Sequence, residues 1–202
     1  GQKIMKALAF TSLILAVAAG PAVAAEAGDW TLRAGPYLVA PKSDNSDIVS
    51  VDDGASLGFT ISYNYSDNWA VELLAATPFS HDIRLVGGGK VAETKHLPPT
   101  LSFQYHWVNE TAFRPYVGLG LNYTTFFDES TEGALAGTDL NLDDSFGFAT
   151  QLGANFMLND HWDLNIDIRW INIETDATLD GADVGKVEID PIVYGLNVGY
   201  RF

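Results

Sequence analysis

The chain has 202 residues, 47% of them hydrophobic, which is enough apolar surface for one sizeable domain. Its formal net charge of -15 argues against nucleic acid as a partner, because phosphate binding requires a basic patch. The chain has no cysteine, which excludes a disulfide framework, a thiolate zinc site and a thiol nucleophile.

The first predicted element is an export signal. Lys3 and Lys6 precede the apolar run of residues 7–20, and the small residues that follow suit cleavage between 24 and 25, with 27/28 as a second choice. A membrane anchor is the alternative, but the apolar run is short for a bilayer and a Gly-Pro pair interrupts it. The sequence therefore predicts a signal peptide over 1–24 and a single domain over 25–202.

The rest of the chain contains stretches that alternate apolar and polar residues, which is the pattern of a β-strand with two different faces. In "WDLNIDIRW", for example, Trp162, Ile166 and Trp170 share one face with other apolar residues, and polar residues occupy the opposite face. About eight such stretches occur, and each is long enough for a tilted strand to cross a bilayer. They cover residues 30–38, 55–66, 69–79, 97–107, 114–127, 146–158, 162–170 and 190–202.

The connections between these stretches alternate in length. Short polar turns lie at 66–68, 109–113 and 159–161, and long acidic loops lie at 41–54, 82–96, 128–144 and 176–185. This pattern is typical of an all-β, eight-stranded antiparallel transmembrane barrel of the bacterial outer membrane, with short periplasmic turns and long extracellular loops. A water-soluble barrel of the lipocalin type is the alternative, but the polar faces are rich in Gly, Ser, Asn and Gln and poor in Lys and Glu.

The polar faces would line a narrow lumen, and near the periplasmic end their residues carry both signs of charge. Buried charges must pair, so we expect a hydrogen-bonded floor of ion pairs there. The predicted floor residues are Arg33, Glu72, Gln104, His106, Arg114, Asn155, Asp163, Asp167, Arg169 and Arg201.

Nearer the outer end the inward residues become apolar on one strand after another. An apolar funnel over a charged floor suits a small hydrophobic guest that enters from outside, although the same residues could pack against the bases of the loops. The predicted apolar lumen comprises Tyr37, Val39, Leu74, Ala76, Phe126, Ala149, Ile171, Ile173 and Val193.

If the floor is closed, a guest must leave sideways. Pro36 lies on the first strand and Pro191 on the last, and these two strands close the barrel. Proline donates no ladder hydrogen bond, so we expect a weak seam here that could release a guest into the membrane, or else an ordinary bulge or rim.

An enzyme is the main alternative from another class, because small outer-membrane barrels include lipid-modifying enzymes. Ser80, His81 and Asp82 are consecutive, but neighbouring residues on an extended chain point to opposite faces. His81 and His96 flank one outer loop and could hold a metal together with Asp82 and Glu93. Ordinary loop hydrogen bonding accounts for them as well, and we predict no enzymatic activity, no cofactor and no metal.

Four stretches resemble the outer membrane protein W (OmpW) family: "VELLAATPFSH" (71–81), "KHLPPTLSFQYHW" (95–107), "FRPYVGLGLNYTTFF" (113–127) and the ending "GYRF" (199–202). The resemblance implies an eight-stranded barrel with a hydrophobic channel, and a family that includes alkane-uptake outer-membrane proteins. The expected function is passage of small hydrophobic molecules. The alternative is a closed barrel that displays acidic loops as a receptor or as a structural or stress-related surface protein.

The expected partners follow from this interpretation. They are small hydrophobic molecules, outer-membrane lipids with lipopolysaccharide, and the barrel-assembly machinery. The last of these would recognise the alternating C-terminal segment that ends in Phe202, which resembles the insertion signal of outer-membrane barrels.

Overall fold

A closed antiparallel sheet forms the body of the protein. The computed structural model describes residues 25–43 and 45–202, and the predicted export signal over 1–24 lies outside them. Each strand of the closed sheet pairs with the next in sequence order, and the last pairs with the first. These strands are β1 (Trp30–Ala40), β3 (Gly54–Asn64), β4 (Trp69–Ala76), β7 (Thr100–His106), β8 (Phe113–Thr131), β10 (Ser145–Met157), β11 (Trp162–Ile171) and β14 (Ile192–Arg201).

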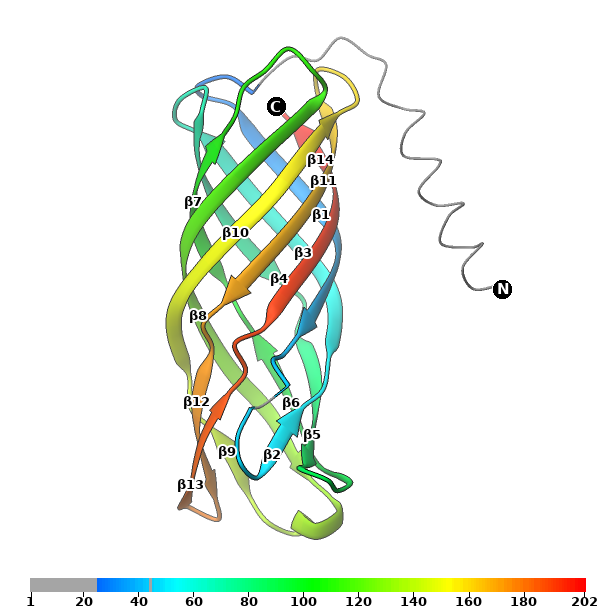
Figure 1. Cartoon of the computed structure of the whole chain (residues 1–202), viewed down its shortest axis with the longest axis vertical. Helices are drawn as coiled ribbons and strands as arrows, with labels where there is room; N and C mark the ends of the chain where they lie inside the picture. The colour runs from blue at the N-terminus through cyan, green and yellow to red at the C-terminus, as the bar shows by residue number, and fades with distance from the viewer. Residues whose placement is uncertain (1–24, 44) are drawn as a thin grey trace, which may run out of the picture.

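The predicted eight-stranded barrel is therefore confirmed. Its strands are tilted around a tall cylinder (Figure 1). The C-terminus and the short connections lie at one end, which we call the turn end, and the long connections lie at the other, the loop end (Figure 1). Among the described residues, no helix is long and apolar enough to cross a membrane.

The four long connections differ from the prediction, because they contain further strands and not loops alone. The hairpin of β5 (Phe79–Leu85) and β6 (Lys90–Leu97) pairs with the outer part of β8, and β2 (Val49–Val51) pairs with β5. A separate sheet contains β9 (Leu140–Leu142), β12 (Glu174–Leu179) and β13 (Ala182–Glu188), and a single 3-10 turn, η1 (Gly133–Leu135), precedes it.

These extensions continue the wall of the barrel beyond the closed sheet, and they also carry inward-facing residues. On β5, for example, Phe79, His81 and Ile83 are buried at alternate positions. The predicted strand over 69–79 is accordingly divided in two, with β4 ending at Ala76 and β5 starting at Phe79.

The outer surface of the closed sheet is an apolar belt. Outward side chains of neighbouring strands, such as Leu119, Phe146 and Phe148, are among the most exposed residues of the molecule, and Phe148 is 70% exposed. Beyond the belt the outward faces become polar. On the β5–β6 hairpin, Ser80 donates a hydrogen bond to Glu93 at 2.9 Å, and Lys90 pairs with the same carboxylate at 3.0 Å. The belt is thus the lipid-facing surface, and the outer face of the β5–β6 hairpin is exposed to water.

Candidate functional site

Ion pairs close the interior near the turn end. The fully buried guanidinium of Arg169 donates through Nη2 to Glu72 and, at 2.8 Å, to Asp167, which also accepts from Nε at 3.0 Å. Arg33 pairs with Asp163 at 3.2 Å and lies 3.8 Å from Glu72. These groups come from β1, β4 and β11, so the charges bridge distant parts of the wall.

Amide and phenol groups fill the rest of this layer. Gln104 donates to Gln151 at 2.9 Å, and Gln151 donates in turn to Asp167. The hydroxyl of Tyr116 accepts from Asn165 at 2.9 Å. Tyr116 and Gln151 are absent from the predicted floor, although each lies on the inward face of its strand, and that register could have identified them.

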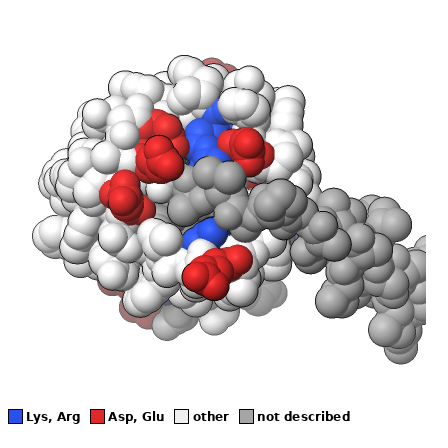
Figure 2. Space-filling view, turned by 90° about the horizontal axis from the view of Figure 1, so that it is seen from above, with Lys and Arg blue, Asp and Glu red and all other residues white. Residues whose placement is uncertain are grey.

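The structure places the predicted floor residues in or beside this network, and all are buried except His106, which is partly buried and stacks on Tyr116. A small cavity of about 40 Å³ lies on the turn side, between Arg33, Arg114 and Arg201 among other residues. Figure 2 looks onto the turn end and shows basic side chains in its middle with acidic ones around them. The axis of the barrel is thus blocked at this level.

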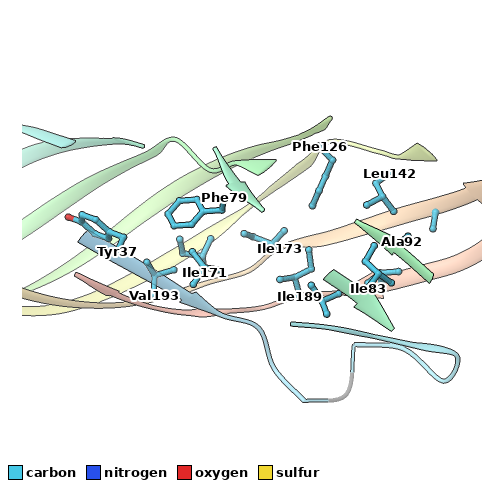
Figure 3. Close-up of a cluster of buried hydrophobic side chains, with 14 of the residues drawn as sticks. Tyr37, Phe79, Ile83, Ala92, Phe126, Leu142, Ile171, Ile173, Ile189 and Val193 are labelled. Carbon is cyan, nitrogen blue, oxygen red and sulfur yellow. The ribbon is translucent and has the colours of Figure 1, made fainter. Parts of the chain in front are cut away.

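An apolar column occupies the interior from Tyr37 to the loop end. Figure 3 shows its side chains following one another from Tyr37 and Val193, past Ile171 and Phe79, to Ile83 and Leu142. Of the nine residues predicted for the apolar lumen, eight belong to this buried cluster, and the partly buried Ala76 packs against it. The extension strands supply further members of the column. Those from stretches predicted as loops are Val51, Ile83, Val91, Ala92, Leu142 and Ala177, whereas Phe79 ends the predicted strand over 69–79 and Val187 lies beyond the loop predicted over 176–185.

Tyr37 marks the boundary between the two layers. Its ring lies over the two strands next to β1 at positions where they have glycine, and a Cβ at Gly58 or Gly195 would overlap it. Its hydroxyl accepts a hydrogen bond from Asn197 at 3.0 Å, on the polar side. One aromatic residue thus presents its ring to the apolar column and its hydroxyl to the floor.

At the loop end the column opens into an apolar pocket of about 150 Å³. Its lining includes Ile83, Ala92, Leu142 and Val187 from the column, together with Leu140 from β9. The residues come from strands on both extension sheets, so the pocket lies where these sheets face each other.

The arrangement of the histidines does not fit the metal site that was considered as an alternative. His81 and His96 do meet, with ring centroids 4.6 Å apart, but Asp82 and Glu93 lie on the outer face of the hairpin, where both pair with Lys90. Ser80 is exposed while His81 is buried, as the alternation predicts. Among the described residues, Glu174, Glu188 and Asp190 form a carboxylate cluster with the spacing of metal ligands. Lys42 and Lys186 already pair with these carboxylates.

The predicted seam is interrupted, but at one proline and not two. Pairing of β1 with β14 runs to Ala34↔Val198 and resumes at Tyr37↔Gly195, skipping Gly35 and Pro36. Pro191, in contrast, precedes β14, and its carbonyl accepts a hydrogen bond from Ile171 at 3.1 Å. The interruption therefore lies beside Tyr37, at the end of the apolar column that faces the turn end. The strands touch here, because a Cβ on Gly35 would overlap the Leu196 carbonyl.

Comparisons with known proteins agree with this architecture. Residues 26–202 match the OmpW family. Outer membrane protein W of Vibrio cholerae is 47% identical over 95% of this chain and 96% of its own length, and outer membrane protein AlkL of Ectopseudomonas oleovorans is 34% identical over 89% and 77%. The crystal structure of outer membrane protein OprG from Pseudomonas aeruginosa superposes with a TM-score of 0.80, at 40% identity over 89% of this chain and 98% of that one. The protein is therefore an outer-membrane β-barrel and belongs to the OmpW family.

Proposed function

We propose that the barrel admits small hydrophobic molecules from outside the cell into its apolar column. In outer-membrane barrels the short turns face the periplasm, so the loop-end pocket would open to the exterior. The observation that carries the proposal is the continuity of buried apolar side chains from this pocket to Tyr37. A water-filled porin would need a polar bore throughout, which these residues do not provide.

One relative supports an apolar guest. A protein of Pseudomonas aeruginosa named for the dibenzothiophene metabolism operon is 27% identical over 88% of this chain and 90% of its own length. Dibenzothiophene is an apolar molecule. The proposed role is passage and not catalysis, since Ser80 and His81 point to opposite sides of β5. Outer-membrane lipids with lipopolysaccharide, and the barrel-assembly machinery acting at Phe202, remain proposed partners.

We further propose that guests leave sideways beside Pro36. The floor blocks the axis, and pairing between β1 and β14 is interrupted at the level where the apolar column ends. Because Pro36 has no N–H to donate, separation of the strands at this point breaks fewer hydrogen bonds than elsewhere in the ladder.

Uptake of a medium-chain alkane by cells that carry the wild type or Ile171→Asp tests the conduit, with surface expression checked in both. Ile171 is fully buried in the column, and a carboxylate there should abolish the gain in uptake. The matched control is Ile168→Asn, because Ile168 is on the same strand but faces lipid. Equal uptake by cells with folded wild type and folded Ile171→Asp would favour the closed barrel that displays its loops.

A disulfide staple tests the lateral exit, and the absence of native cysteine makes the experiment clean. Leu38 and Tyr194 are paired across the seam just beyond Pro36, so a cysteine pair there should block release when oxidised and restore it when reduced. A cysteine pair at Ile61 and Leu73 staples β3 to β4 as the control. Unchanged uptake in the oxidised seam variant would exclude this exit.

A further inference from the structure

Two imidazoles sit inside the otherwise apolar column. His81 on β5 is 1% exposed and His96 on β6 is fully buried. The rings of Phe79 and Phe126 flank His96, with centroids 5.5 and 5.8 Å from it. Burial of polar groups among aromatic side chains is unfavourable unless each polar atom finds a partner.

Most of the nitrogens of this histidine pair have no partner within the protein. Nδ1 of His81 lies 2.6 Å from the backbone carbonyl oxygen of Asp52, and because a carbonyl only accepts, this nitrogen carries the proton. Nε2 of His81 is then a lone-pair acceptor, and it has no hydrogen-bond partner. Both nitrogens of His96 are also buried without a partner.

Both rings are neutral at physiological pH. Burial lowers the pKa of His81, although Asp52, Asp53 and Asp82 act in the opposite direction. Burial and the neighbouring His81 lower the pKa of His96 well below its usual value. A neutral His96 has one N–H and one lone pair, so the histidine pair offers one donor and two acceptors.

The histidine pair lies next to the loop-end pocket, on the side that faces the turn end. Ile83, which lines the pocket, is two residues beyond His81 on the inward face of β5, a rise of about 7 Å. On β6, Ala92 lines the pocket, and Thr94 separates it from His96 on the same face. A molecule that enters the pocket and moves down the column therefore meets the unpaired nitrogens.

We propose that His81 and His96 form a binding site for the neutral hydroxyl headgroup of an otherwise apolar guest, such as a long-chain alcohol. A hydroxyl both donates and accepts, so its proton can go to Nε2 of His81 while its oxygen accepts from the N–H of His96. An alkane satisfies neither nitrogen, and a carboxylate would bury a charge without a cation. The site refines the proposed conduit and rests on it, since the guest must reach the column.

Binding is tested directly on the full-length barrel in lipid nanodiscs, with ¹⁵N-labelled histidine followed by NMR. Titration with 1-dodecanol should shift the ring nitrogens of His81 and His96, and dodecane should not. His161, in the turn between β10 and β11, is the internal reference and should not move. If the alcohol leaves both column histidines unshifted, or if the two compounds act alike, the site does not exist.

Transport supplies the second test, as the ratio of 1-dodecanol uptake to dodecane uptake above that of cells without the barrel. His81→Phe and His96→Phe should each lower this ratio roughly three- to tenfold, the value of about one neutral hydrogen bond. His161→Gln is the control. An unchanged uptake ratio in folded variants overturns the histidine site alone. A wild type that admits neither compound overturns the conduit. In that case the NMR titration still decides whether the headgroup binds to the histidines.

Discussion

Removal of the Arg169 guanidinium should destabilise the barrel strongly. Its side chain is fully buried, and the carboxylates of Glu72 and Asp167 are each 2% exposed, so Arg169→Met leaves two buried anions facing each other. Arg33, 3.8 Å from Glu72, compensates only in part. Breaking a buried ion pair by removing one partner costs about 3–5 kcal/mol, and we expect a loss of this size in the free energy of unfolding.

The measurement is urea unfolding of the barrel in lipid vesicles, followed by tryptophan fluorescence and extrapolated linearly to zero urea. Lys186→Met is the control, because it breaks an exposed pair with Glu174 and should cost less than about 1 kcal/mol. Adding Glu72→Gln and Asp167→Asn to Arg169→Met neutralises all three groups and should recover much of the loss. If Arg169→Met is as mild as Lys186→Met, the floor is not a desolvated ion network.

Three further predictions concern the column. Lowering the pH from 7.5 to 5.5 should reduce the free energy of unfolding. Below the ordinary histidine pKa of 6.5 the unfolded chain takes up protons that the buried His81 and His96 bind less well. In the same urea titrations, the double variant His81→Phe/His96→Phe should show a weaker dependence of the free energy of unfolding on pH. Gly195→Val should cost about 1–3 kcal/mol by displacing Tyr37, and the change should shrink in a Tyr37→Ala background. Ile173→Ala should cost about 2–5 kcal/mol in urea, as expected for a cavity at a fully buried site, and a value below 1 kcal/mol would mean that the column is loosely packed.

Much of the barrel could be predicted because, along each strand of the closed sheet, residues that face lipid alternate with residues that face the lumen. In "WDLNIDIRW", Ile166 and Ile168 face lipid while Asp167 and Arg169 face the floor, and the period of two fixes both assignments at once. The direction of each strand then gives the height of each inward residue, which is why Ile171 and Arg33 were placed at opposite ends of the lumen.

The extension strands could not be predicted in the same way. Outside the lipid the outward face has no need to be apolar, so the stretch around Ser80 and Glu93 looks like a solvated loop. That His81 and His96 meet could be predicted from their positions on either side of one connection, but the register Phe79↔His96 and His81↔Thr94 could not. The placement of Pro191 on the last strand was wrong, since Pro191 precedes β14 and its carbonyl accepts a hydrogen bond from Ile171 on β11.

The interactions that stabilise the barrel would also restrict the route of the proposed guest. An apolar molecule that passed along the axis would have to displace the Arg169 pairs and the Gln104–Gln151 bond, and each displaced group would lose its partner without gaining another. The cost rises with every polar group, whereas parting two strands beside Pro36 exposes few unmet donors and leads directly into lipid. If the proposed conduit operates, a charged floor that is tight enough to hold the cylinder together would therefore favour a guest that stops at Tyr37 and turns sideways.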